Sequence, residues 1–89
     1  MTTKTNKAAE EIGHFFLSRR LELEISIEDA ANYSSISIEQ LGDYEAGRRP
    51  IPFSEVFALS NLYSIPPDEV VKLFYEVIFN TKNTSIGTG

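Results

Sequence analysis

The sequence predicts an all-α domain, and three observations lead to this fold class. Apolar residues recur at helical intervals, and no stretch of any length shows the alternation of a β-strand. Good capping residues precede the helical stretches, and glycine or proline follows several of them. The chain has 89 residues, of which 42% are apolar, so one modest core is expected rather than two. We therefore expect a single compact domain of five helices.

The expected elements follow one another with short connections. The expected helices span residues 8–24, 27–33, 38–46, 53–63 and 67–79. The first has Ile12, Phe16 and Leu23 at helical spacing, and Gly13 favours a close approach of another helix. In the fourth, the apolar residues Phe53, Val56, Leu59, Leu62 and Tyr63 are expected to turn inward. Residues 1–7 are expected to form a flexible arm, and the polar residues 80–89 a disordered tail.

The second and third expected helices carry strong local signals at their ends. Ser26 is a good N-cap, and Asp29 three residues later can reach back to it as a capping box. Ser37 and Gln40 form a second pattern of this kind, a Ser-x-x-Gln capping box. Gly47 stands where a helix needs a left-handed residue at its end. Two short capped helices joined by a tight turn make up a helix-turn-helix unit.

The charge distribution is unusual for a protein that binds nucleic acid. The net charge is −5, whereas such proteins usually have a basic patch. Residues 21–47 contain seven acidic side chains and no basic one, and Arg48 and Arg49 follow at once. The chain has no cysteine, its N-terminus is polar, and no stretch is apolar enough to span a membrane. We expect a soluble cytoplasmic protein.

The sequence does not favour an enzyme. His14 is the only histidine, and it is expected on the surface of the first helix. Cysteine, histidine and aspartate show no metal-ligand spacing, and no glycine-rich phosphate loop is present. We therefore expect no metal, no cofactor and no small-molecule substrate.

A set of short pieces between residues 12 and 71 occurs in a characteristic order and spacing: Ile12-Gly13, Arg20, Ile25-Ser26, Ala31, Ile36-Ser37, Leu41, Glu45, Gly47, Arg48-Arg49, Pro50, Val56, Leu59 and Ile65. In these pieces residues 12–71 resemble the Xre-type (phage Cro/CI repressor-like) helix-turn-helix family. The resemblance implies a five-helix domain whose third helix is the recognition helix. It also implies an ion pair between Arg20 and Glu45, because a carboxylate without a partner beside Leu41 would be costly.

The resemblance also implies where DNA would bind. The implied base-facing residues are Ser37, Ile38, Glu39, Gln40 and Asp43, with Gly42 on the same side. Gln40 either pairs with adenine or serves as the cap partner of Ser37. The implied contacts around them are Ser26, Ile27, Arg48 and Arg49, with Lys4 and Lys7 of the arm as further cations. Ile27 and Ser35 depart from the family, which has glutamine and glycine at these positions.

Two classes of function follow. The first is a sequence-specific DNA-binding transcriptional regulator, a repressor or autoregulator that binds a palindromic site as a dimer and is nucleoid-associated when bound. The alternative is a protein-interaction module or anti-repressor with little DNA affinity, favoured by the acidic unit and an exposed Ile27. Salt-sensitive binding to duplex DNA would favour the first class, and binding to a protein partner would favour the second.

The fifth expected helix has more apolar residues than one face can hold. Only Lys72 and Glu76 supply charge over ten residues. One side is expected to pack on the domain and the other to meet a second copy. The expected homodimer contacts are Val70, Phe74, Val77 and Ile78.

Overall fold

The computed structural model describes residues 7–87, with side chains described from residue 7 to residue 79. These residues form the α-helices α1 (Lys7–Glu22), α2 (Ile27–Ser34), α3 (Ile38–Ala46), α4 (Phe53–Leu62) and α5 (Pro67–Gly87). The described part of the chain contains no β-strand, so the expected all-α fold is confirmed. Residues 1–6 of the expected arm and residues 88–89 of the expected tail lie outside the described residues.

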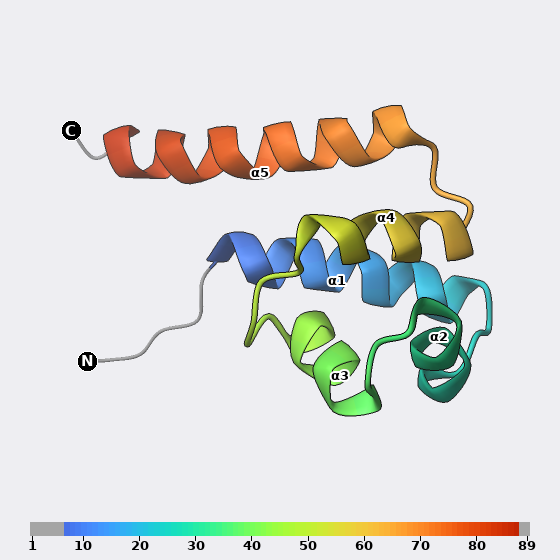
Figure 1. Ribbon diagram of the computed structural model, residues 1–89. Coiled ribbons are helices and arrows are strands. Elements are labelled where there is room, and N and C mark those ends of the chain that lie inside the picture. The colour runs from blue at the N-terminus through green and yellow to red at the C-terminus, as the bar shows by residue number, and fades with distance from the viewer. Residues whose placement is uncertain (1–6, 88–89) are drawn as a thin grey trace.

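The helices surround α1, which lies at the centre of the domain (Figure 1). α1 packs against α3 on one side and against α5 on the other, while α2 packs against α3 and α4. The helix-turn-helix unit therefore lies on the side of α1 opposite α5 (Figure 1). This arrangement leaves α2 and α3 at one surface of the molecule and α5 at another.

One apolar core joins the helices. Its largest fully buried side chains are Phe16, Leu41, Tyr44, Val56, Leu59 and Tyr63. One expected core position is wrong: Phe53 is 65% exposed at the start of α4. Phe53 instead lies against Phe57 and Phe74, with ring centroids 5.3 and 6.2 Å away, so it covers the core edge without entering it.

α5 is longer than expected and has a different inward face. It continues to Gly87, so the expected helix end at residue 79 is too early. Residues 80–86 contain neither glycine nor proline, and extending an existing helix is less costly than starting one. Val70 and Val77 are 7% and 3% exposed, respectively. Their assignment to a dimer interface is therefore wrong, because both side chains are already buried in the domain.

Candidate nucleic-acid interface

The turn between α2 and α3 is built from short-range hydrogen bonds. The Asp29 N–H donates to Ser26 Oγ over 3.0 Å, which caps α2. α2 ends at Ser35, whose φ of 57° is left-handed, and the Ile36 N–H donates to the Ala31 carbonyl over 3.0 Å. Ser35 stands where the family uses glycine, and a side chain in this conformation costs about 1–2 kcal/mol. The turn therefore keeps its shape despite the substitution.

The start of α3 has the capping box that the sequence predicts. The Gln40 N–H donates to Ser37 Oγ over 3.0 Å, and the Ser37 N–H donates to Gln40 Oε1 over 3.4 Å. Of the two roles considered for Gln40, the structure shows the cap. A bidentate bond to adenine needs both the oxygen and the nitrogen of the amide, so it would require Gln40 to leave this cap.

The outer side of α3 is open and carries few groups that can bind bases. Ile38 is 48% exposed, and Ser37 and Glu39 are exposed beside it. A Cβ atom at Gly42 would meet nothing within 4 Å, so the fold does not require glycine there. Ile27, in contrast, is partly buried against the core, so its expected full exposure on this surface is wrong.

An ion pair fixes α3 to α1. Arg20 Nε donates to Glu45 Oε2 over 2.7 Å, and Arg20 Nη2 donates to Glu45 Oε1 over 3.1 Å. Only 11% of the Arg20 side chain and 8% of the Glu45 side chain are exposed. The hydrogen bond to Glu45 raises the pKa of Arg20, against an opposing effect of burial. Arg20 Nη1 also donates to the Ile25 carbonyl over 2.8 Å, so one guanidinium joins α1, α3 and the loop before α2.

A second polar contact, which the sequence did not predict, joins α3 to α4. The Tyr44 hydroxyl donates to Glu55 Oε1 at the edge of the core. Burial and this hydrogen bond raise the pKa of Tyr44 to about 12. Burial likewise raises the pKa of Tyr63 to about 12. The signal available in the sequence was a tyrosine on the inner face of α3, since most buried phenols find a hydrogen-bond partner, although the buried Tyr63 hydroxyl has none among the described residues.

The C-terminal end of α3 holds an ion cluster of three residues. Arg48 Nε lies 3.0 Å from Asp43 Oδ1, and Arg49 Nη2 lies 3.4 Å from Asp43 Oδ2. The sequence assigned Asp43 to base contacts and the arginines to phosphate contacts, but here the single Asp43 carboxylate pairs with both arginines and offsets one of their two charges. Glu28, Asp29 and Glu39 remain exposed along α2 and α3, so the surface of the unit is acidic.

The helix-turn-helix family HTH_3 matches residues 17–70, which include the whole of α2, α3 and α4. The chain belongs to this family. The resemblance inferred from the sequence is thus confirmed, and helix-turn-helix membership supports a DNA-binding transcriptional regulator rather than an enzyme. No curated protein matches the chain in sequence at a significant level.

A solved structure shows the same fold. The clp gene regulator ClgR from Corynebacterium glutamicum is similar to this helix-turn-helix protein with a TM-score of 0.70. The match covers 96% of this chain and 92% of the ClgR chain, at 14% sequence identity. At this identity the likeness concerns the fold, so the contacts to DNA must be argued from this chain's own residues.

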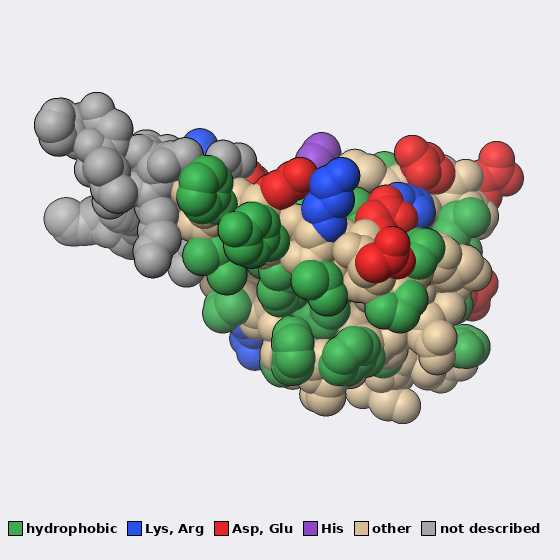
Figure 2. All heavy atoms as spheres, turned by 90° about the horizontal axis from the view of Figure 1, so that it is seen from above, with side chains coloured by type: hydrophobic (Ala, Val, Ile, Leu, Met, Phe, Trp, Pro, Cys, Tyr) green, Lys and Arg blue, Asp and Glu red, His purple; other side chains and the backbone are tan. Residues whose placement is uncertain are grey.

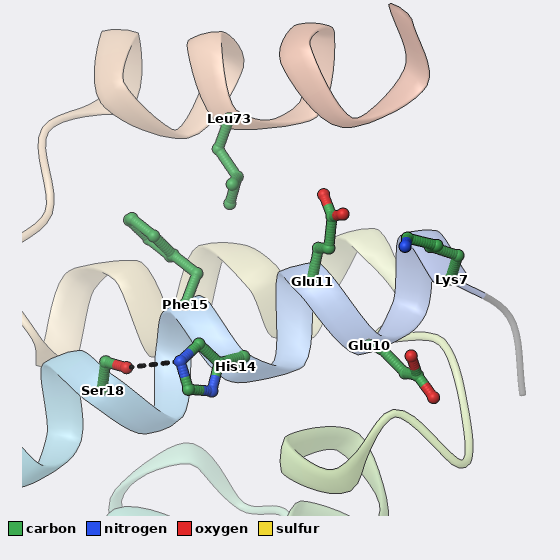
Figure 3. Close-up of a pocket in the computed structure, with 7 residues that line it drawn as sticks. All are labelled: Lys7, Glu10, Glu11, His14, Phe15, Ser18 and Leu73. Carbon is green, nitrogen blue, oxygen red and sulfur yellow. Dashed lines mark hydrogen bonds between the residues drawn. The ribbon is translucent and has the colours of Figure 1, made fainter. Parts of the chain in front are cut away.

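A groove of about 520 Å³ lies between α1 and α5 (Figure 3). Its lining includes His14, whose Nε2 lies 3.4 Å from Ser18 Oγ, with Phe15 and Leu73 facing each other across it (Figure 3). Among residues 7–79 no group of histidine, cysteine, aspartate or glutamate side chains is arranged to hold a metal ion. Within the described part of this helix-turn-helix protein, no helix is long and apolar enough to cross a membrane.

Proposed function

We propose that this helix-turn-helix protein is a sequence-specific transcriptional regulator that represses, or autoregulates, from a palindromic site as a dimer. The observation that carries the proposal is the combination of a rigidly held α3 with an exposed outer side. The Arg20–Glu45 pair fixes α3 from within, while Ser37, Ile38 and Glu39 project outward. A helix presented in this way can enter a major groove.

Few side chains on α3 can read bases, and each has a defined chemistry. Glu39 can accept from a cytosine amino group, and Ile38 can contact a thymine methyl group. Gly42 leaves room for a base pair to approach the helix backbone. Exposed N–H groups at the starts of α2 and α3 add contacts to phosphate. The recognised site is therefore expected to contain C·G and T·A pairs opposite α3.

The first experiment is a salt titration of binding to genomic duplex fragments, followed by sequencing of the retained DNA. A retained palindromic motif is expected, with affinity falling as salt rises. Because this surface has few cations, the slope of log K against log salt is expected to be shallow, about −2 to −4. Failure to retain any fragment at low salt would contradict DNA binding.

A variant of Glu39 tests base reading directly. Glu39→Ala is expected to reduce the preference for the retained motif by about five- to a hundredfold, since a lost base contact costs about 1–3 kcal/mol. Glu11→Ala removes the same charge from an exposed position on α1 and is the matched control. Equal motif preference in both variants, measured by competition with random duplex, would show that Glu39 reads no base.

We propose a dimer surface on α4 and α5, where apolar side chains are exposed. An exposed stripe of α5 has the spacing i, i+4, i+7 and i+8 and consists of Val71, Tyr75, Ile78 and Phe79. The rings of Tyr75 and Phe79 are stacked 6.1 Å apart. Phe53 and Phe57 of α4 are also exposed, and they line an apolar groove of about 230 Å³ beside this stripe. Figure 2 shows hydrophobic side chains gathered on this face, with charged side chains along one edge.

We expect this surface to form a two-fold interface with a second copy of the chain. A two-fold interface pairs a surface with itself, and this one offers both projecting rings and an apolar groove. Of the contacts assigned from the sequence, Ile78 remains exposed and Phe74 is partly buried at the groove. Val71, Tyr75 and Phe79 replace the buried Val70 and Val77 in the proposed interface.

Introducing charge on this stripe tests the dimer. The double variant Val71→Glu and Ile78→Glu is expected to raise the dimer dissociation constant by about thirtyfold or more, since a central interface residue is worth about 2 kcal/mol. The double variant Lys72→Ala and Glu76→Ala alters the charged side of the same helix and should leave the dimer intact. Sedimentation equilibrium measures both. An unchanged constant in the first variant would place the interface elsewhere.

A second function is favoured by the acidity of α2 and α3. Glu28, Asp29 and Glu39 have no ion-pair partner among the described residues, and the apolar side chains Tyr33 and Ile38 are exposed near them. A basic protein partner fits this chemistry. Retention of no DNA at low salt, together with salt-sensitive capture of a basic protein, would favour this interaction module over a DNA-binding regulator.

A further inference from the structure

The cations near α3 are few, and their partners are known. Residues 21–47 contain no lysine or arginine. On α1, Arg20 is held by Glu45 and Arg19 lies 2.7 Å from Glu69. Arg48 and Arg49 are thus the cations of the described chain that lie next to the outer side of α3, and any strong attraction of this surface for phosphate depends on them.

Both of these arginines are bound to one carboxylate. Asp43 presents Oδ1 to Arg48 and Oδ2 to Arg49, so each oxygen has its own guanidinium partner. The Asp43 side chain is 28% exposed, whereas those of Arg48 and Arg49 are 64% and 50% exposed. The arginines can therefore swing away into solvent, while Asp43 stays on the helix beside the base-facing positions.

We propose that Asp43 is a specificity-determining residue that suppresses binding to non-cognate DNA by holding Arg48 and Arg49 as its counterions. The proposal rests on the DNA-binding function proposed above. On random sequence a phosphate that approaches either arginine meets the Asp43 carboxylate, which already accepts from one nitrogen of each guanidinium and repels the phosphate. When phosphates take both arginines, Asp43 is left unpaired next to a polyanion, which offsets the gain.

Cognate DNA removes this penalty. A cytosine amino group at the end of α3 gives the Asp43 carboxylate a new hydrogen-bond donor. Arg48 and Arg49 are then released to the phosphates without leaving a carboxylate unpaired. Base reading and phosphate binding are in this way coupled through one side chain, so discrimination arises from weak binding to wrong sequences as well as from strong binding to the right one.

The variant Asp43→Asn tests the proposal, because asparagine keeps the shape and loses the charge. Glu39→Gln is the charge-matched control on the same helix, since Glu39 contacts neither arginine. Each substitution is made in the native chain and in the double variant Arg48→Ala and Arg49→Ala. Fluorescence anisotropy with a random-sequence duplex, and with the motif that the native protein retains, gives the affinities, and circular dichroism checks folding.

Asp43→Asn is expected to tighten binding to random duplex by about three- to thirtyfold, as two exposed ion pairs are released. Glu39→Gln is expected to tighten it by less than about threefold. In the background without the arginines, the extra gain of Asp43→Asn should disappear. The ratio of motif affinity to random affinity should fall about tenfold or more in Asp43→Asn.

Two results would overturn the proposal in distinguishable ways. If Asp43→Asn and Glu39→Gln tighten random binding equally, or if the gain persists without the arginines, Asp43 has no special role, although the native protein still selects its motif. If neither the native protein nor Asp43→Asn binds any duplex at low salt while both are folded, the proposed DNA-binding function fails, and the role of Asp43 fails with it.

Discussion

Arg20→Ala is expected to lower the free energy of unfolding by about 3–5 kcal/mol, because it leaves the Glu45 carboxylate buried without its partner. The pair is bidentate, and only 8% of the Glu45 side chain is exposed. The same substitution frees the Ile25 carbonyl, which accepts from Arg20 at the entry to α2. A domain of this size has a total stability of about 4–13 kcal/mol, so the variant will be marginal.

The neighbouring arginine is the matched control. Arg19 pairs with Glu69 and lies over the Phe15 ring, but its side chain is 27% exposed and that of Glu69 is 40% exposed. Arg19→Ala is therefore expected to cost at most about 1 kcal/mol. Urea unfolding of the two variants measures the difference. Equal and small losses would show that the buried pair contributes little.

Replacing both Arg20 and Glu45 separates two contributions to the loss of stability. One is the loss of the ion pair itself, and the other is the cost of a buried Glu45 carboxylate without a partner. Arg20→Met combined with Glu45→Leu fills the same space with apolar atoms and leaves no buried carboxylate. This double variant is expected to be clearly more stable than Arg20→Ala. A double variant as unstable as Arg20→Ala would indicate that the hydrogen bonds themselves, including the one to Ile25, carry most of the stability.

Gly13→Ala is expected to destabilise the domain by more than about 3 kcal/mol, although alanine is the better helix former by about 1 kcal/mol. A Cβ atom at Gly13 would overlap the Tyr44 carbonyl oxygen and lie 3.1 Å from the Glu45 carbonyl oxygen. These are backbone atoms of α3, so the clash can be relieved only by moving α1 and α3 apart. That movement would also open the Arg20–Glu45 pair and the core around Phe16.

Gly42→Ala is the matched control within α3. A Cβ atom there meets nothing within 4 Å, and the expected effect is a gain of about 0.5–1 kcal/mol from helix propensity. The two substitutions are chemically identical and are expected to have opposite signs. Thermal and urea unfolding of both variants measure this. A gain in stability for Gly13→Ala would mean that α1 and α3 are not in close contact.

Gly13 was recognised from the sequence as a site of close helix packing, but the sequence does not show which residue it contacts. The glycine in the first helix predicts a close approach of another helix, but the residue it meets follows from how α1 crosses α3. The capping residues Ser26, Ser37 and Gly47, in contrast, were assigned correctly from the sequence, although of the two expected capping boxes the structure shows only the one at α3. Ser26, Ser37 and Gly47 each make their bonds within five residues, so no distant part of the chain is needed to specify them.

The candidate interface was predicted in part. Ser37, Ile38 and Glu39 lie exposed on α3 as the family resemblance implies. The ion pairs of Asp43 with Arg48 and Arg49 were not predicted, although the three residues are close in sequence. Each of these side chains can point to solvent, to a phosphate or to another of the three, and the sequence does not indicate which. The partial burial of Ile27 was also not predicted. Which side of α2 is covered depends on the rotation of this helix about its own axis, and packing against the core determines that rotation.

By itself, the sequence determined the number and order of the helices, the capped turn between α2 and α3, and the family, because these depend on local hydrogen bonds and on helical periodicity. Only the tertiary structure decided which of two apolar sides of α5 is buried. Val70 and Val77 face the domain, while Val71, Tyr75 and Phe79 face outward. The physical reason is that a helix with two apolar sides has no preferred rotation about its own axis until it packs against its neighbours, here α1 and the Phe53 ring of α4.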